Sequence, residues 1–527
     1  MAEVHKLPIG IQSFEDLRRN QYLYVDKTQY IWELVNTGKS YFLSRPRRFG
    51  KSLLITTIEA YFQGQKELFD GLYIDRMESK KEQPWVKHAV IHFSLSGGEY
   101  LEKDGLWQRL SRTIATFETK YNIHTDGMDL VNRFGEVIEQ LYQQTGQQVV
   151  VLVDEYDKPL LSAMEANPVQ EEKNRQLYKD FFSVLKDEDR YLKFVFFTGV
   201  TKFSKVSIFS DLNQLQDISM REDMSGICGI TADELERSFE TEIARLAGKQ
   251  KENRTECLEH IRKMYDGYHF AADGEDIYNP FSLLNAFQSL QYGKYWFETG
   301  TPTFLIRKLR ESTIAPEELI HGVSATEDEL RTYRAEDRNP IPLLYQSGYL
   351  TLQSYDREFG IYTLTFPNEE VEYGFLNALV PTLLGERDHE HPFSMRELIM
   401  ELRKGDAAGF LDDVKALFAT IPYLDGRAAE YESYWRNQIF LILQLMGMYT
   451  RCEVHTATGR CDCVVETTEY IYILEFKLDH SAEDALRQIE EKQYAAPCIS
   501  DPRKIYRIGV QFSSKKRNIE DFQIETD

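Results

Sequence analysis

One turn between a strand and a helix constrains the fold of this chain more than any other feature. The apolar segment SYFLS at 40–44 reads as a buried strand, and residues 52–62 read as a helix. The turn that joins them ends in Gly50-Lys51-Ser52. Main-chain amides of such a turn, together with the start of the following helix, can cradle phosphate groups. The junction therefore predicts a phosphate-binding loop in an α/β domain.

The loop has a residue for each role in nucleotide binding. The Lys51 ammonium can neutralise phosphate oxygens, and the Ser52 hydroxyl can ligate Mg²⁺. Arg45 departs from the usual pattern GxxxxGK[ST], because it stands where that pattern has its first glycine. The residues that we expect to bind the nucleotide are Arg45, Pro46, Arg47, Arg48, Phe49, Gly50, Lys51, Ser52, Asp154 and Thr198.

Three further apolar runs, at 88–96, 148–154 and 192–200, continue the pattern of the first strand. Near-continuous apolar runs are typical of parallel strands that are covered on both faces. A helix-like segment at 106–121 separates the first two runs, as the crossover of a parallel sheet requires. The N-terminal part is therefore predicted to be a parallel sheet with helices on its faces.

Polar residues end two of these runs. Asp154 closes the second run and Glu155 follows it, while Thr198 and Thr201 lie at the end of the third. Asp154 would hold Mg²⁺ through water, Glu155 would orient or deprotonate the attacking water, and the threonines would sense the γ-phosphate. Taken singly, these patterns also fit a surface lysine at a helix start or a helix cap. Their combination in this order favours a P-loop ATPase.

A chain of 527 residues is longer than one hydrophobic core usually organises, so several domains are expected. After the strand-rich part the pattern becomes helical, beginning with the capping box Thr231…Glu234. We predict a P-loop domain at 1–225, a helical lid or connector at 226–385, and a restriction-endonuclease-like α/β domain at 386–527.

Near the C-terminus, two carboxylates and a lysine recur at a spacing that suits phosphodiester hydrolysis. Residues 459–466 and 470–477 read as a hairpin, and alternation along the second strand places Glu475 and Lys477 on one face. If Asp462 meets that face, the carboxylates can hold Mg²⁺ or Mn²⁺, and Lys477 can activate water and stabilise the charge on phosphorus. An ordinary ion pair on a surface hairpin is the alternative reading.

Two helices flank this hairpin in the prediction. Glu432 lies on the apolar face of a helix over 431–446, and Gln488 lies on a helix that Ser481 and Asp484 cap. Gln488 can order the catalytic groups. The metal ligands that we expect are Ser52 and Asp154 at the nucleotide site, and Asp462, Glu475 and Glu432 at the second site.

Charge and cysteine content limit the environment of the chain. The 62 basic and 85 acidic residues leave a formal net charge of −23, which opposes non-specific binding of nucleic acid. A nucleic-acid partner therefore needs a local basic site. Six cysteines do not form a dense disulfide framework, and the sequence has neither a signal-peptide pattern nor a membrane-spanning run. We expect free thiols, a cytoplasmic protein and no membrane partner.

The chain resembles a bacterial family of AAA-ATPase-like proteins with a C-terminal PD-(D/E)XK nuclease domain. The resemblance implies the same architecture and residue roles, and in that family arginine also replaces the first P-loop glycine. The matching segments are Leu7–Gly10, Tyr24–Thr28, Arg45–Ser52, Val153–Pro159, Thr198–Ser204, Tyr265–Tyr268 and Gly459–Lys477.

Three functions fit the sequence. The first is an ATPase whose nucleotide gates a metal-dependent nuclease acting on DNA or RNA, with ATP and Mg²⁺, or Mn²⁺ at the nuclease site, as cofactors. The second is a sensor or signalling NTPase whose C-terminal domain binds nucleic acid without cutting it. The third is an interaction scaffold that keeps its nucleotide for structural reasons. Because the sequence places no arginine finger, a homo-oligomer stays open.

Overall fold

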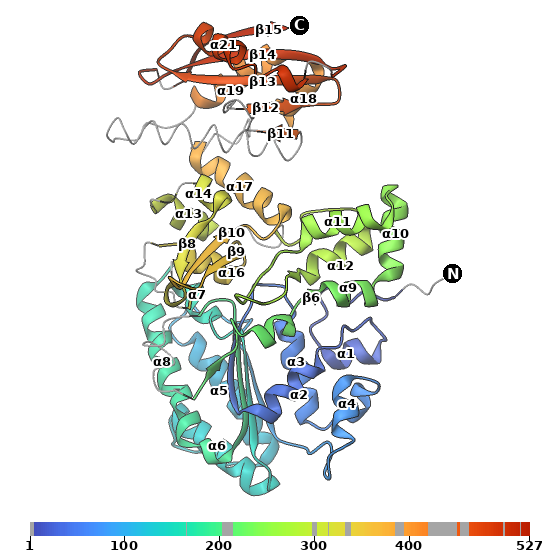
Figure 1. The fold of residues 1–527 in the computed structure, drawn as a ribbon. Coiled ribbons are helices and arrows are strands. Elements are labelled where there is room, and N and C mark those ends of the chain that lie inside the picture. Colours follow the sequence, from blue (N-terminus) through green and yellow to red (C-terminus); the bar gives the residue numbers. More distant parts are fainter. Residues whose placement is uncertain are drawn as a thin grey trace. The chain divides into compact units, whose positions relative to one another are not determined.

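The computed structural model describes residues 5–164, 166–202, 214–297, 303–312, 314, 316–331, 339–384, 395–419, 451–453, 463–498, 501–516 and 518–526. Two compact units divide the chain. Unit 1 comprises residues 1–300 and 322–371, and unit 2 comprises residues 301–321 and 372–527. The elements of each unit are drawn in Figure 1.

Unit 1 is built on a five-stranded parallel sheet in the order β2-β3-β4-β1-β5. Strand β3 is buried along its whole length, as a strand covered on both faces requires. The α/β fold predicted for this part is confirmed, and the first four strands fall within the predicted segments. The strands are β1 (Ser40–Ser44), β2 (Val90–Ser94), β3 (Val149–Asp154), β4 (Leu192–Gly199) and β5 (Gln216–Asp217).

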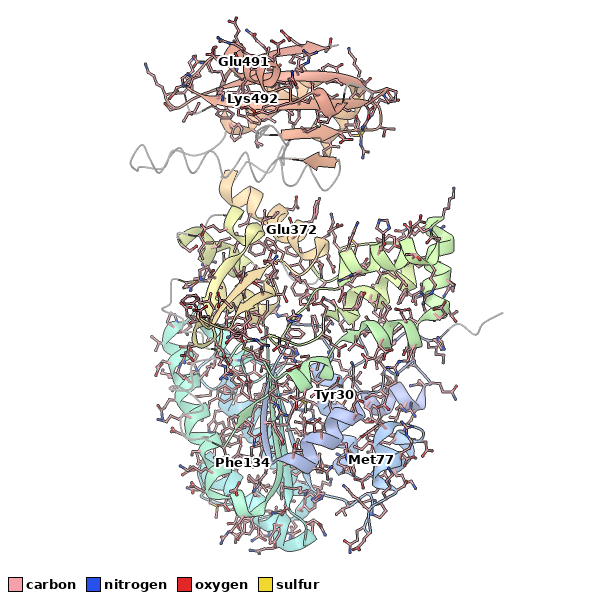
Figure 2. All side chains as sticks on the ribbon, in the orientation of Figure 1. Tyr30, Met77, Phe134, Glu372, Glu491 and Lys492 are labelled. Atoms are coloured by element: carbon pink, nitrogen blue, oxygen red, sulfur yellow. The ribbon has the colours of Figure 1, made fainter. Side chains whose placement is uncertain are left out.

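Helices cover both faces of this sheet. Helices α5, α6 and α8 lie on one side, and α2 and α3 lie on the other (Figure 1). Phe134 of α6 is labelled in Figure 2. Its ring stacks on that of Phe181 of α8 and meets that of Phe93 of β2 edge-on, so aromatic rings fill one interface. The helices of this part are α1 (Phe14–Arg19), α2 (Thr28–Thr37), α3 (Lys51–Phe62), α4 (Tyr73–Glu78), α5 (Gly105–Tyr121), α6 (Leu130–Thr145), α7 (Lys158–Met164) and α8 (Pro168–Asp187).

The strand order decides which side chains can meet. Strand β4 pairs with β1 on one side and with β3 on the other. Because all three strands are parallel, their carboxyl ends share one edge of the sheet. The loop after β1, the carboxylates after β3 and the threonines at the end of β4 therefore lie at the same edge.

The part of unit 1 after the sheet is largely helical and starts with the predicted capping box, in which Thr231 and Glu234 bond to each other's main chain. Phe239, Ile243 and Phe287 pack in its core. Its elements are β6 (Ile230–Thr231), α9 (Ala232–Ser238), α10 (Glu240–Gln250), α11 (Arg254–Tyr265), β7 (Ile277–Tyr278), α12 (Pro280–Ser289), α15 (Glu327–Arg331) and α16 (Ile341–Ser347).

This region also holds strands that the helical prediction omitted. A three-stranded antiparallel sheet runs in the order β8-β10-β9. Most of region 226–371 clusters with the parallel sheet in unit 1, and the division into three domains stays a prediction. The added strands are β8 (Val323–Thr326), β9 (Thr351–Asp356) and β10 (Ile361–Thr365).

Unit 2 contains a mixed sheet in the order β11-β12-β13-β14-β15, in which β13 and β14 are parallel and the other pairs are antiparallel. The predicted hairpin is present as β12 and β13. The strands are β11 (Arg451–Glu453), β12 (Cys463–Glu466), β13 (Tyr470–Leu478), β14 (Lys504–Ser513) and β15 (Asn518–Thr526). The helices are α13 (Thr303–Glu311), α14 (Pro316–His321), α18 (Met395–Lys404), α19 (Ala407–Ala419) and α21 (Ala482–Glu491), and α17 (Glu369–Leu384) begins in unit 1.

Alternation along β13 separates two packing faces of this sheet. Ile471 and Ile473 pack with residues of α21, whereas the Tyr472 hydroxyl donates to a carbonyl of α18. Gly509 of β14 lets α21 approach closely, because a Cβ there would lie 2.2 Å from the Ala482 carbonyl oxygen. The mixed sheet with flanking helices agrees with the predicted α/β fold of the C-terminal domain.

Within the described parts of the chain, none of the helices has both the length and the apolar character needed to cross a bilayer.

Candidate functional site

The loop after β1 adopts the turn that the sequence predicts. Gly50 precedes α3 with a φ of +94°, and Arg48 also lies in the left-handed region with a φ of +67°. Glycine adopts this conformation freely, whereas in arginine it is energetically costly. Helix α3 begins at Lys51, so the positive end of its dipole and its first amides face the loop. Such a turn can surround an anion with main-chain donors.

Lys51 is folded back onto this loop. Its ammonium donates to the carbonyl oxygens of Arg45 and Pro46, at 2.9 Å each. Burial lowers the pKa of the ammonium, and the nearby carboxylates of Asp154 and Asp157 oppose that effect. A buried cation that rests on neutral carbonyls gains strongly from an anion, so the loop is suited to a phosphate group.

Asp154 and Thr198 meet at the ends of β3 and β4. The Thr198 hydroxyl donates to the Asp154 carboxylate at 2.7 Å, and both side chains are buried. Asp157 holds the segment after β4, since one of its oxygens accepts from the amides of Val200 and Thr201 and from the Thr201 hydroxyl. The acidic groups after β3 are therefore tied to the end of β4.

Glu155 stands at the turn after β3 with a φ of +54°. For a residue other than glycine this backbone conformation is strained, and such strain clusters at functional sites. Burial, followed by the negative charge of Asp154, raises the pKa of Glu155, while Lys51 acts in the opposite direction. The carboxyl and the ammonium are thus close enough to influence each other's ionisation.

Glu155 and the loop line a cavity of about 480 Å³, a volume in the usual range for small-molecule sites. The predicted nucleotide-binding residues divide between its lining and its surroundings. Arg47, Arg48, Phe49, Gly50, Lys51 and Ser52 line the cavity, whereas Arg45, Pro46, Asp154 and Thr198 do not.

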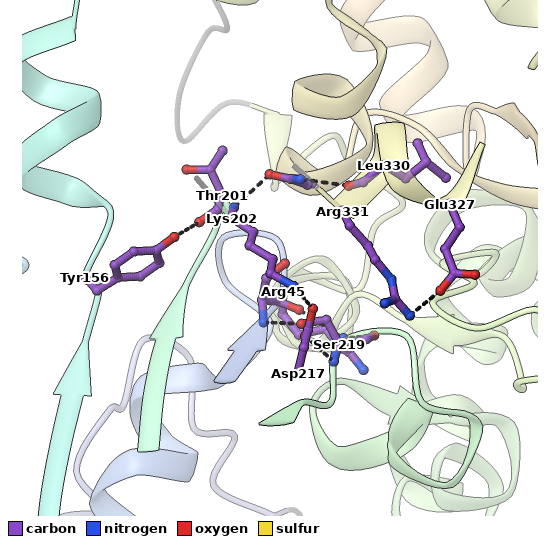
Figure 3. A network of polar contacts seen from close by, with 11 residues as sticks. Arg45, Tyr156, Thr201, Lys202, Asp217, Ser219, Glu327, Leu330 and Arg331 are labelled. Atoms are coloured by element: carbon purple, nitrogen blue, oxygen red, sulfur yellow. Dashed lines mark hydrogen bonds and ion pairs between the residues drawn. The ribbon is translucent and has the colours of Figure 1, made fainter. Parts of the chain in front are cut away.

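Arg45 differs most from its predicted role. Its guanidinium is buried and donates to the carbonyl oxygens of Ser44, Ser219 and Met224, at 2.9, 2.7 and 3.1 Å. The guanidinium carbon also lies 4.1 Å from the centre of the Phe270 ring. Figure 3 shows Arg45 beside Ser219 in this polar network. The side chain therefore holds the start of the loop and is directed to main-chain carbonyls instead of the cavity.

A second cluster of predicted residues lies between β13 and α21 of unit 2. Glu475 is 2% exposed, and the Lys477 ammonium lies 3.5 Å from its carboxylate. The Gln488 amide joins them, because its oxygen accepts from Lys477 and its nitrogen donates to Glu475. The same nitrogen lies 3.4 Å from the Tyr494 hydroxyl oxygen. The structure thus brings together three of the five residues predicted for this site.

The opposite face of β13 is apolar at this position. The ring centre of Phe476 lies 6.4 Å from that of Phe512, and the Phe512 ring in turn meets the Phe418 ring of α19 edge-on. The two remaining predicted ligands, Asp462 and Glu432, lie outside the described residues. Among the side chains that the structure describes, no three histidine, cysteine, aspartate or glutamate residues are grouped closely enough to hold a metal ion.

Sequence analysis missed several residues around the cavity. The N-terminal segment Pro8–Gln12 lines it, as do Phe239 and Phe281 from the helical region. The guanidinium of Arg48 lies 4.9 Å from the centre of the Phe281 ring. Asp157 also lines the cavity. Two of the matching segments, Leu7–Gly10 and Val153–Pro159, contained a signal for these residues, although neither assigned them a role.

Comparison with known proteins agrees with this geometry. The family described as "Predicted AAA-ATPase" matches residues 8–209, and the PD-(D/E)XK nuclease superfamily matches residues 430–522. A protein of Azotobacter chroococcum mcd 1, described as "Uncharacterized protein in vnfD 5'region", is 36% identical over 535 residues. That alignment covers 99% of this chain and 99% of the relative. The alignment with this relative therefore extends over both of the matched segments.

Proposed function

The chain belongs to the family of predicted AAA-ATPases whose C-terminal part falls in the PD-(D/E)XK nuclease superfamily, and we propose that it is an ATP-hydrolysing protein whose nucleotide gates a metal-dependent nuclease. The observation that carries this proposal is the convergence at one sheet edge. Lys51 and Glu155 line one cavity, and Asp154 and Thr198 are bonded to each other beside it.

The residues of the first site divide the work of binding and hydrolysing ATP. The amides of residues 47–52 surround the phosphates, and Lys51 leaves the loop carbonyls for the phosphate oxygens. Ser52 and Asp154 have the oxygen donors that Mg²⁺ prefers, with Asp154 acting through water. The ion would neutralise charge on the β- and γ-phosphates. Glu155 orients the attacking water and accepts its proton.

Apolar residues of the same cavity are suited to the other end of the nucleotide. Ile9 and Ile11 of the N-terminal segment and Phe281 of α12 line it together with the phosphate loop. A nucleobase gains from contact with aliphatic side chains and an aromatic face. This arrangement supports a nucleotide, whose base has an apolar face, as the ligand.

At the second site, Glu475 and Lys477 supply the chemistry of a phosphodiesterase. The buried carboxylate of Glu475 is a hard oxygen ligand for Mg²⁺ or Mn²⁺, and we assign Asp462 and Glu432 as its partners. The ion would activate a water molecule and stabilise the charge that forms on phosphorus. Lys477 positions that water, and Gln488 keeps Lys477 and Glu475 at their mutual distance.

One experiment tests both activities. The purified full chain is incubated with plasmid, linear and single-stranded DNA and with RNA, with and without ATP, in Mg²⁺ or Mn²⁺. Metal-dependent cleavage that changes with ATP is the expected result. ATP turnover with nucleic-acid binding but no cleavage would identify a sensor NTPase. If the protein does not hydrolyse ATP, the proposal is contradicted, and the interaction scaffold is the remaining alternative.

A further inference from the structure

A tryptophan from the helical region bonds directly to the phosphate loop. The indole N–H of Trp296 donates to the main-chain carbonyl of Arg47 at 2.9 Å, although 248 residues separate the two in sequence. The neighbouring carbonyls of Arg45 and Pro46 are bonded to Lys51, which the nucleotide is expected to recruit. The hydrogen bond from Trp296 does not involve Lys51, so it can persist when Lys51 moves to the phosphates.

This bond orients an amide as well as a carbonyl. A trans peptide is planar, so the carbonyl of Arg47 and the N–H of Arg48 belong to one rigid group and point in opposite directions. By holding the carbonyl, the indole directs the Arg48 N–H away from itself. Arg48 has a φ of +67°, a conformation that a residue other than glycine keeps only when its surroundings enforce it. Trp296 is one such constraint.

Trp296 is itself held in a fixed position. It is 5% exposed, and its ring lies 5.1 Å from that of Tyr349 and 6.5 Å from that of Tyr268. Tyr268 in turn meets Phe49 of the loop edge-on at 4.7 Å. Next to Tyr349, Gly348 leaves no room for a side chain, since a Cβ there would lie 2.6 Å from the Pro46 ring. The loop therefore packs directly against the rings of Trp296, Tyr268 and Tyr349 and the neighbouring Gly348.

The main chain of the same tryptophan bonds to helix α17. The Trp296 N–H donates to the Glu370 carboxylate at 2.7 Å, in a buried position. Glu370 lies in the first turn of α17, and the boundary between the compact units falls within this helix, after Val371. One residue thus contacts both the phosphate loop and the start of the helix that continues into unit 2.

We propose that Trp296 is a positioning residue that sets the Arg47–Arg48 peptide for phosphate binding and couples this peptide, through Glu370, to α17. This inference rests on the proposed function, because it presumes that the loop binds the phosphates of ATP. Nucleotide phosphates that engage the Arg48 amide change the hydrogen bond on the other side of the same peptide. The change reaches Trp296, and from there the first turn of α17.

The test separates a polar role from packing. Trp296→Phe keeps an aromatic ring and removes the N–H donor, while Trp107→Phe, at an exposed position of α5, is the matched control. Calorimetry of the full chain should show MgATP binding about tenfold weaker in Trp296→Phe, which corresponds to the loss of one hydrogen bond, with adenosine binding within about twofold of wild type. Trp107→Phe should match wild type with both ligands.

Amide hydrogen exchange tests the coupling without an activity assay. At MgATP concentrations that saturate each protein, exchange in α17 should slow in wild type and Trp107→Phe and stay unchanged in Trp296→Phe. Glu370→Gln, which weakens the second bond and leaves the loop intact, should bind MgATP like wild type and also lose the change in α17. It serves as the second variant if Trp296→Phe folds poorly.

The outcomes distinguish this inference from the proposed function. If wild type does not bind MgATP, the proposed function fails and the inference falls with it. If wild type binds and Trp296→Phe binds equally well, or loses ATP and adenosine affinity alike, the positioning role is wrong while the proposed function stands. Unchanged exchange of α17 in wild type would overturn the coupling.

Discussion

The hydroxyl of Thr198 donates a 2.7 Å hydrogen bond to the carboxylate of Asp154, and this bond joins the ends of neighbouring strands β4 and β3. Thr198 is 0% exposed and Asp154 is 5% exposed, so water cannot readily replace the donor. The bond fixes the orientation of a carboxylate that we assign to the metal ion.

Removing this hydroxyl should destabilise the fold. Thr198→Val keeps the shape of the side chain and leaves a buried carboxylate oxygen without its donor, so the free energy of unfolding should fall by about 1–3 kcal/mol. Chemical denaturation of the full chain measures the change. Thr198→Ser keeps the hydroxyl and should lose less than half as much. Equal stability of all three proteins would mean that the bond contributes nothing.

Lys51→Ala should weaken ATP binding at least about 100-fold, since it removes a charge-assisted bond to the phosphates in a buried site. By linkage, MgATP should raise the melting temperature of wild type and not that of the variant. Lys249→Ala, on the exposed face of α10, is the control and should bind like wild type. Tight binding by Lys51→Ala would contradict the assignment of the loop.

Glu155→Gln should separate binding from hydrolysis. The amide keeps the size of the side chain and cannot accept the proton of the attacking water, so turnover should fall by about 100- to 10,000-fold. The dissociation constant for MgATP should stay within about threefold of wild type. Phosphate release and calorimetry measure the two quantities. An unchanged turnover rate would exclude Glu155 as the general base.

Substitutions of Glu475, Lys477 and Gln488 should lower nucleic-acid cleavage to different extents. Glu475→Ala and Lys477→Ala should each lower cleavage at least about 100-fold, and Mn²⁺ should not rescue the lysine variant because Lys477 is not a ligand. Gln488→Ala should cost about tenfold, since it only releases its two partners. Glu491→Ala, on the exposed end of the same helix, is the control. Cleavage by every variant at the wild-type rate would place the activity elsewhere.

Asp266 should make stability depend on pH. Burial raises the pKa of its carboxyl to about 6, from an ordinary value of 3.8. The folded chain therefore holds this proton more tightly than the unfolded chain, and the resulting stabilisation is lost as the pH rises from about 4 through 6. Asp266→Asn has no proton to lose, so its stability should gain on that of wild type by on the order of 2 kcal/mol across this window.

Denaturation at several pH values measures this difference. Asp233→Asn, in the exposed first turn of α9, should run parallel to wild type. A constant difference between wild type and Asp266→Asn from pH 4 to 7 would show that the Asp266 carboxyl has the same pKa in the folded and unfolded chains.

Features with a local cause were predictable from the sequence. Strands β1 to β4 follow from near-continuous apolar runs, because burial on both faces favours apolar residues at most positions. The capping box at Thr231 and the one at Ser481 follow from spacing alone, since each cap closes within one helical turn. The face shared by Glu475 and Lys477 follows from the two-residue period of a strand.

Features that depend on distant partners were not predictable. The N-terminal segment Pro8–Gln12 lines the cavity by contacts with residues far along the chain, and such contacts have no periodic signal. Strand β8 alternates buried and exposed residues over only four positions, too few to separate it from its helical neighbours. From the sequence, Arg45 is predicted to bind phosphate. Its actual partners, the carbonyls of Ser219 and Met224, lie far along the chain and leave no signal near the loop.

The burial of Arg45 has a consequence for the evolution of such loops. Replacing it by the glycine of the usual pattern would leave a space the size of an arginine side chain and three carbonyl oxygens without their donor. Arg45→Gly is therefore not a neutral step, and we expect an arginine at this position to be inherited together with the segment whose main chain supplies the acceptors at Ser219 and Met224.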